Sequence, residues 1–175
     1  TANAALAAKD YIKPFDGACL ILFGDHPLFY PETFQKMLDK CESGVDVVVL
    51  GFKPKDPARY GRLIMDDDGL KAIVEYKDAT DEQRAIGLCN SGAMCVNGRH
   101  LYNLLCQVDN QNAAKEYYLT DIVKIAKAQH LKVDVQIAED EYEVAGINSR
   151  EQQAQAEAIF QKRMRQKALN SGVTL

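Results

Sequence analysis

The sequence lacks the features that mark membrane, secreted and zinc-binding proteins. No apolar stretch approaches the roughly 20 residues of a membrane-spanning helix, and no signal peptide is visible. The five cysteines form no Cys-x-x-Cys pair, so we expect reduced core thiols in a cytoplasmic protein. The three histidines do not cluster, which argues against a zinc site.

An excess of positive charge is also missing. The chain has 21 Lys and Arg against 25 Asp and Glu, a net charge of −4, so we expect no basic surface for nucleic acid. An anionic ligand would then need a local site and a metal. There is no internal repeat, low-complexity tract or second domain, and 175 residues with 47% hydrophobic content suit one domain with a real core.

The order of the apolar segments predicts an α/β protein. Residues 18–23 and 45–50 are short apolar runs typical of buried strands, and a helix beginning at Pro31 separates them. Strand, helix and strand in this order predict parallel pairing through a right-handed crossover. Further strands are expected at residues 62–65, 70–75, 87–96 and 132–137, and helices at 2–9, 98–107, 119–129 and from Ser149 to about 169.

Polar segments predict how some of these elements begin, turn or bulge. Thr80 with Gln83, and Ser149 with Gln152, have the spacing of helix capping boxes. The acidic residues 66–68 fit a hairpin tip whose carboxylates face water better than a metal loop. Residues 90–92, Asn-Ser-Gly, interrupt an apolar strand, which indicates a bulge or a close approach of a ligand. Basic residues in the last helix, Arg163 among them, are expected on a solvated face.

Asp25 is the first candidate for chemistry. It follows Gly24 at the carboxyl end of the first apolar run, where open α/β sheets bind their ligands. A carboxylate there is suited to hold Mg²⁺ against phosphate oxygens. The segment is equally suited to be a plain turn, and these residues alone leave both readings open.

Six segments, in this order and spacing, resemble the uridyltransferase domain of the bifunctional N-acetylglucosamine-1-phosphate uridyltransferase / glucosamine-1-phosphate acetyltransferase enzymes. The resemblance covers essentially the whole chain. The segments are Phe23-Gly24-Asp25-His26-Pro27-Leu28, Tyr60-Gly61-Arg62, residues 74–84, Asn90-Ser91-Gly92, Glu116-Tyr117-Tyr118-Leu119-Thr120-Asp121 and Gly146-Ile147-Asn148-Ser149-Arg150.

The resemblance implies a fold and a reaction. The fold is a Rossmann-like nucleotide-diphospho-sugar transferase fold, with a mixed, mostly parallel sheet flanked by helices and a β-hairpin insertion. The reaction converts UTP and N-acetylglucosamine 1-phosphate to UDP-N-acetylglucosamine and pyrophosphate with Mg²⁺ as cofactor. By resemblance, Asp25 and Asn148 are the catalytic metal ligands. The expected substrate-binding residues are Thr1, Gly24, Gly61, Glu75, Asn90, Tyr118 and Thr120.

These residue types suit the implied chemistry. A sugar 1-phosphate is mostly dianionic near neutral pH, so catalysis is positioning and charge neutralisation. Glu75 and Asn90 can form hydrogen bonds with hydroxyl and amide groups of a sugar. Gly61 has no Cβ, so the backbone can come close to a ligand where a side chain would clash. Without the resemblance, Asn148 reads more readily as a turn residue and Glu75 as an exposed strand residue. A buried Asn90 needs partners in either reading.

Residues 1–175 are expected to be a partial nucleotidyltransferase domain. The family's glycine-rich phosphate loop and its carboxyl-terminal left-handed β-helix have no counterpart here, so this chain alone is expected to be incomplete and inactive. The alternatives are a related enzyme with another sugar 1-phosphate, or a non-catalytic binding or assembly fragment. Expected partners are the substrates and UDP-N-acetylglucosamine, without nucleic acid or membrane; a homo-oligomer is left open. The resemblance also implies a cytoplasmic enzyme whose product, UDP-N-acetylglucosamine, is used to build peptidoglycan and lipopolysaccharide.

Overall fold

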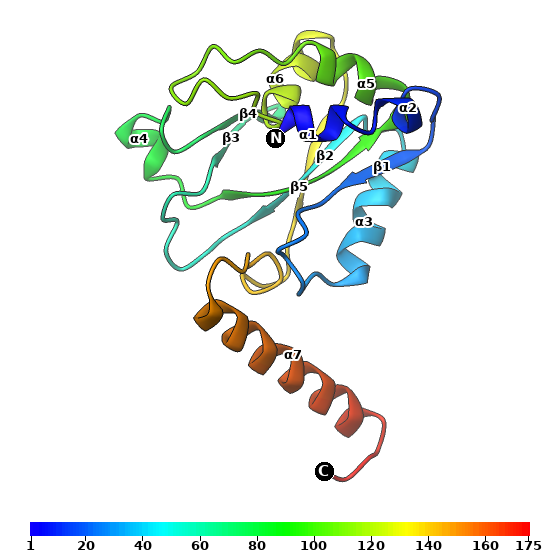
Figure 1. Ribbon diagram of the computed structural model, residues 1–175, viewed down its shortest axis with the longest axis vertical. Helices are drawn as coiled ribbons and strands as arrows, with labels where there is room; N and C mark the ends of the chain where they lie inside the picture. The colour runs from blue at the N-terminus through cyan, green and yellow to red at the C-terminus, as the bar shows by residue number, and fades with distance from the viewer.

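A six-stranded mixed sheet with helices on both faces forms the body of the protein (Figure 1). The computed structural model describes all residues, 1–175. The strands are β1 (Ala18–Ile21), β2 (Val47–Phe52), β3 (Arg62–Asp66), β4 (Gly69–Val74), β5 (Cys89–Asn97) and β6 (Val133–Ile137). The helices are α1 (Ala2–Leu6), α2 (Lys9–Ile12), α3 (Pro31–Glu42), α4 (Asp81–Arg84), α5 (Gly98–Cys106), α6 (Asp121–Ala128) and α7 (Arg150–Asn170).

The sheet has the order β4-β3-β5-β2-β6, and β1 also pairs with β5. The mixed α/β architecture is therefore as predicted, but the expected direct pairing of the strands at 18–23 and 45–50 is wrong. β1 and β2 run in the same direction, yet each pairs antiparallel with β5, which lies between them. The β2–β6 pair is parallel, and the remaining neighbouring strands pair antiparallel. Most strands nevertheless run in the same direction, so the predicted mostly parallel sheet is right for the direction of the strands and wrong for the pairing of neighbours.

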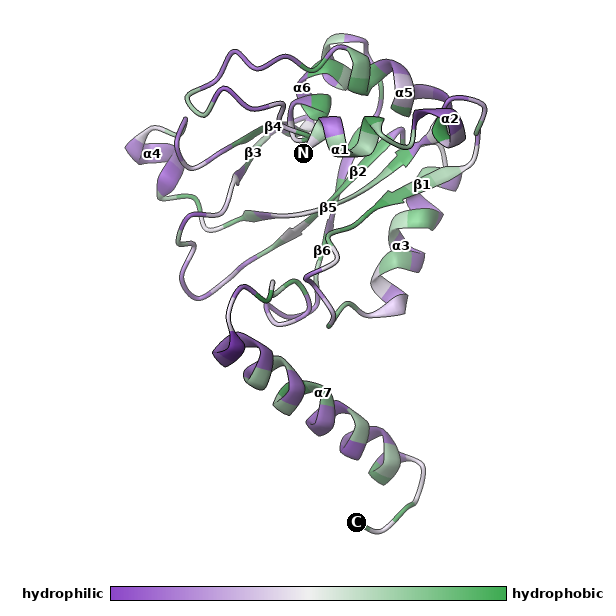
Figure 2. Cartoon of the chain, in the orientation of Figure 1, coloured by the Kyte–Doolittle hydropathy of each residue, from purple (hydrophilic) through white to green (hydrophobic).

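Hydrophobic clusters cover the two faces of β2 and β5. Val47 and Val49 point toward the cluster shared with α1, α5 and α6, whereas Val48 and Leu50 point toward α3. This alternation follows from the two-residue period of a strand. Figure 2 shows hydrophobic residues concentrated in the central strands. Cys106 lies on the surface, which corrects the expectation that all five thiols belong to the core.

The predicted hairpin and bulge are both present. β3 and β4 join through an exposed turn in which Asp66 pairs with Gly69, so the acidic residues form a hairpin tip. In β5 the register against β2 shifts between Asn90 and Met94, and Gly92 takes a φ of +89°. The bulge turns the Asn-Ser-Gly segment out of the regular ladder.

The two predicted capping boxes differ. Thr80 and Gln83 form the full reciprocal box. Ser149 accepts a hydrogen bond from Gln152 N–H, but the Gln152 side chain accepts from Asn148 N–H at 2.6 Å instead of from Ser149. The second helix start therefore holds the backbone of Asn148 in place.

Helix α7 extends away from the sheet (Figure 1), and only Ala156 of its residues is buried. Arg163 fastens its second half to the body. The guanidinium donates to the Leu28 carbonyl and to Asp140 Oδ2, and it stacks 4.0 Å above the Tyr30 ring. Arg163 thus departs from the solvated face predicted for it. None of the helices combines the length and the apolar character needed to cross a bilayer.

Candidate functional site

A pocket of about 320 Å³ gathers most of the residues predicted to bind substrate. Its lining comes from the start of the chain, the segment after β1, the segment before β3, the residue after β4, strand β5 with its bulge, and the segment before α6. Six of the seven predicted substrate-binding residues line it: Thr1, Gly61, Glu75, Asn90, Tyr118 and Thr120. Gly24 is the seventh and does not line it.

Glu75 is the main charged group inside this pocket. The Thr120 hydroxyl donates to Glu75 Oε1 at 3.0 Å, which fixes one carboxylate oxygen. Burial raises the pKa of Glu75 above its usual range, and the Thr120 hydrogen bond opposes that rise; the nearby carboxylates Asp121, Asp78 and Glu116 add to it. The second carboxylate oxygen is available to a hydroxyl or amide donor.

Gly61 and Asn90 form the adjoining wall. Asn90 N–H donates to the Gly61 carbonyl at 2.8 Å, which joins the segment before β3 to β5. A Cβ on Gly61 would lie 3.3 Å from Glu75 Oε2, so glycine leaves room beside that carboxylate. Asn90 Oδ1 accepts from Gly92 N–H at 3.0 Å, and the Asn90 amide NH₂ keeps its donors for a ligand.

Thr1 is tied to the segment that ends in Thr120. Its hydroxyl accepts from Leu119 N–H at 2.9 Å, and its amino group donates to the Tyr117 carbonyl at 2.9 Å. Residues distant in sequence therefore form one continuous edge of the pocket.

Asp25 and Asn148 lie in two loops that contact each other, and neither residue lines the pocket. Ile147 N–H donates to the Asp25 carbonyl at 2.9 Å. The Asp25 carboxylate is about half exposed, at 47%, and its Oδ2 would lie 3.5 Å from a Cβ placed on Gly146. The predicted metal ligands are thus neighbours in the fold.

The buried carboxylate of Glu143 joins these two loops. Glu143 is fully buried; its Oε1 accepts from Tyr30 N–H at 3.2 Å and its Oε2 from Glu139 N–H at 3.1 Å. Tyr30 follows the Asp25 segment, and Glu139 precedes the Asn148 segment, so the carboxylate bridges both.

Asp25 and Asn148 offer oxygen donors of the kind that a divalent cation takes. No group of three or more His, Cys, Asp or Glu side chains gathers to hold a metal ion. Mg²⁺, however, is commonly bound by one or two protein oxygen ligands together with substrate phosphates. One carboxylate and one amide oxygen match that pattern. Burial lowers the pKa of neighbouring His26, and Asp25 opposes the shift.

Sequence reasoning missed two charged residues of the pocket, Arg59 and Glu116. Both lie beside or within segments that carry the resemblance: Arg59 directly precedes Tyr60-Gly61-Arg62, and Glu116 begins the Glu-Tyr-Tyr segment. The only sign in the sequence that they belong to a site was a charged side chain in or beside these segments. Only the fold shows that both side chains border the same space.

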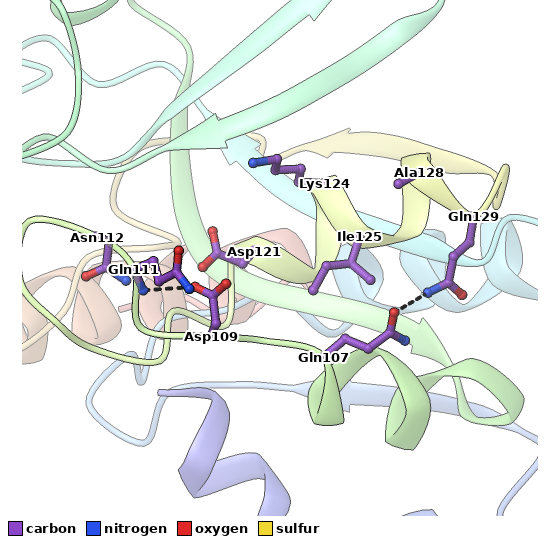
Figure 3. A pocket seen from close by; sticks show the side chains of 9 residues that line it. All are labelled: Gln107, Asp109, Gln111, Asn112, Asp121, Lys124, Ile125, Ala128 and Gln129. Carbon is purple, nitrogen blue, oxygen red and sulfur yellow. Dashed lines mark hydrogen bonds between the residues drawn. The ribbon is translucent and has the colours of Figure 1, made fainter.

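A second hollow of about 440 Å³ lies between the end of α5 and α6 (Figure 3). Its lining is mostly polar, and Gln129 donates to Gln107 across it at 2.9 Å. None of the predicted site residues lines it, so the candidate site is the smaller pocket.

Comparison with solved structures shows which known fold this chain shares. A crystal structure described as a "putative glucose-1-phosphate thymidylyltransferase" from Bacillus anthracis, in complex with a sucrose, matches with a TM-score of 0.65 and 15% identity. The match covers 91% of this chain and 60% of that one. At this identity the likeness shows a shared fold and no activity, and that fold agrees with the Rossmann-like α/β architecture that the resemblance implies.

The particular relatives are proteins named bifunctional protein GlmU. The one from Roseobacter denitrificans is 53% identical over 175 residues, 100% of this chain and 38% of its own length. The one from Rhodospirillum rubrum is 53% identical over 177 residues (100% and 40%), and that from Paramagnetospirillum magneticum is 48% identical over 177 (100% and 39%).

These comparisons confirm the resemblance drawn from the six segments. The whole chain matches GlmU proteins, and it spans about two fifths of their length. No family model matches the chain.

Proposed function

We propose that this chain carries the site at which UTP and N-acetylglucosamine 1-phosphate become UDP-N-acetylglucosamine and pyrophosphate. The observation that carries the proposal is the shared pocket. Gly61, Glu75, Asn90 and Thr120 come from four separate segments and line one space with hydrogen-bonding groups. The match to proteins named bifunctional protein GlmU along the whole chain agrees with the family resemblance that implies these substrates.

In this proposal, the pocket binds the amino sugar. Glu75, held by Thr120, accepts hydrogen bonds from sugar hydroxyl or amide groups. The Asn90 amide donates to an acceptor on the sugar, and Gly61 leaves space for the ring beside Glu75. The sugar phosphate is a dianion and attacks the α-phosphorus of UTP without a general base. The chain's contribution is to align the two reactants.

Asp25 and Asn148 are the proposed ligands of Mg²⁺. When bound, the ion would neutralise phosphate charge and orient the phosphate oxygens. The chain's part is to hold the two ligands together through the Ile147–Asp25 hydrogen bond and the Glu143 bridge. In this proposal the product, UDP-N-acetylglucosamine, is made in the cytoplasm and used in the assembly of peptidoglycan and lipopolysaccharide.

The test is pyrophosphate release from UTP and a panel of sugar 1-phosphates by the longest protein that contains this chain. N-acetylglucosamine 1-phosphate should be the preferred substrate. Asp25→Ala should lower turnover at least about a hundredfold because a direct metal ligand is lost. Asn148→Ala should act in the same direction but less severely, because a neutral ligand is lost.

Asp67→Ala is the matched control, since it removes an exposed carboxylate from the hairpin tip. Near-normal turnover of Asp25→Ala with Mg²⁺ as the only metal would refute the metal assignment. Preference for another sugar would change the substrate. No pyrophosphate from any sugar 1-phosphate would favour a non-catalytic binding or assembly role.

A further inference from the structure

Two cysteines are in contact between helix α3 and the sheet. Cys41 lies in the last turn of α3 and Cys95 in strand β5, and their Sγ atoms are 3.3 Å apart. Both side chains belong to the buried hydrophobic cluster on the α3 side of the sheet. Because a disulfide joins sulfurs at about 2.05 Å, this pair needs a further approach of only about 1.2 Å to bond.

The other three thiols have different surroundings. Cys19 lies opposite Val96 in the β1–β5 ladder and packs against the cluster on the other face of the sheet. The Cys89 thiol donates to the Gly87 carbonyl at 3.8 Å, and Cys106 is exposed at the end of α5. The sulfur–sulfur contact therefore selects one pair out of five cysteines.

A hollow of about 380 Å³ gives access to one member of this pair. Cys41 lines the hollow, together with Ala18, Asn97 and Arg99, and Cys95 does not. Cys41 is 7% exposed, whereas Cys95 is 0% exposed. A small molecule in this hollow therefore meets the sulfur of Cys41 first.

The contact also makes the two thiols chemically unequal. The hydrogen bond with Cys95 lowers the pKa of Cys41, and burial and the charge of Asp46 oppose that shift. The same hydrogen bond, together with burial, raises the pKa of Cys95. Since the thiolate is the reactive form of cysteine, Cys41 is the better nucleophile of the two.

We propose that Cys41 and Cys95 form a reversible dithiol–disulfide site, in which a hydroperoxide oxidises Cys41 and Cys95 then closes the disulfide. This site is separate from the candidate pocket and does not depend on the proposed function. None of the residues that line the pocket belongs to the pair.

The chemistry balances with hydrogen peroxide as the oxidant. The Cys41 thiolate attacks one peroxide oxygen and the O–O bond breaks, which leaves a sulfenic acid on Cys41 and hydroxide, which the proton lost from Cys41 converts to water. The Cys95 sulfur then attacks the Cys41 sulfur, the S–O bond breaks, and the hydroxyl leaves as water with the Cys95 proton. The two thiols lose two electrons and two protons in total, and the peroxide is reduced to two waters.

Peptide mapping after peroxide treatment tests the proposal in the longest protein that contains this chain. Trypsin separates Cys41 from Cys95, because lysines and arginines lie between them. The folded wild type should yield one peptide pair joined through Cys41 and Cys95, and dithiothreitol should release it. Cys41→Ser and Cys95→Ser should each abolish this crosslink.

Two variants are matched controls. Cys89 lies in the same tryptic peptide as Cys95, residues 85–99, so Cys89→Ala should keep the crosslink and thereby assign it to Cys95. Cys106→Ser removes an exposed thiol from α5 and should also keep it. Circular dichroism shows whether each variant has folded.

Trapping the intermediate tests the order of the two steps. In Cys95→Ser the sulfenic acid on Cys41 has no thiol partner, so dimedone should label Cys41. Cys41→Ser should show about tenfold less label on Cys95, because the buried thiol with the raised pKa is the poorer nucleophile.

Three results would overturn the proposal. The first is that the folded wild type forms no crosslink between Cys41 and Cys95 in peroxide. The second is that its crosslinks match those of the protein unfolded in urea, because the folded contact would then select no pair. The third is equal dimedone labelling of the two single variants, which contradicts Cys41 as the sulfur that meets the oxidant.

Discussion

Glu75 shows, at the scale of a single residue, how a partly buried carboxylate in the pocket can oppose stability. Its pKa is raised mainly by burial, so the folded state holds the proton more tightly than the unfolded chain. Stability is therefore greatest below the unfolded pKa of about 4.3 and falls as pH rises through the folded pKa. We expect Glu75→Gln to melt at a higher temperature than the wild type at pH 8 and at the same temperature at pH 4. Thermal melts across this range check the prediction.

Glu82→Gln is the control of opposite sign. The Thr80 hydroxyl donates to Glu82, and this hydrogen bond lowers the pKa of the carboxyl. Its charge stabilises the folded state above the unfolded pKa, so the variant should gain nothing at pH 8. A melting temperature for Glu75→Gln below that of the wild type at pH 8 would contradict the role given to burial.

At the scale of the element, strand β5 depends on a glycine in its bulge. Gly92 has a φ of +89°, and a Cβ there would collide with the Phe23 ring. We expect Gly92→Ala to lower the free energy of unfolding by about 1–3 kcal/mol, because the alanine is strained and the ring must move. Urea denaturation measures this difference.

Gly87→Ala provides the comparison within the same part of the chain. No atom lies within 4 Å of a Cβ placed on Gly87, so its unfolding free energy should change by no more than about 0.5 kcal/mol. Equal stability of Gly92→Ala and Gly87→Ala would show that the bulge tolerates a side chain.

At the scale of the whole molecule, α7 depends on few contacts with the body. Arg163 contributes several of them through Leu28, Asp140 and Tyr30. We expect Arg163→Ala to speed hydrogen exchange in the second half of α7 while β2 and β5 keep their protection, because local opening needs only these contacts broken. Exchange measured by mass spectrometry resolves the two regions.

Arg165→Ala removes a neighbouring exposed arginine that takes part in no ion pair of the chain. It should exchange like the wild type. Unchanged exchange in Arg163→Ala would mean that the helix start, with Ser149, Gln152 and the buried Ala156, suffices to hold α7.

Most helices and strands could be predicted because they depend on interactions between residues close together in the chain. Apolar runs, the acidic turn and the Asn-Ser-Gly interruption each depend on neighbours within a few residues, and the strands, hairpin and bulge appear where they were expected. The Thr80 cap formed as predicted for the same reason. For Asp25 and Asn90 the residues alone left a ligand-binding role open beside a structural one; the resemblance favoured the metal and sugar-binding roles, which stay predictions.

The sequence by itself determined which segments become strands and helices, because hydrophobic period and capping act over short distances. Only the tertiary structure decided that β5 lies between β1 and β2, since a pattern along one strand does not name its partner. The fold also placed Arg59 and Glu75 along one pocket and Arg163 over the Tyr30 ring. Such contacts join residues far apart in the chain, and they exist only once the sheet has packed.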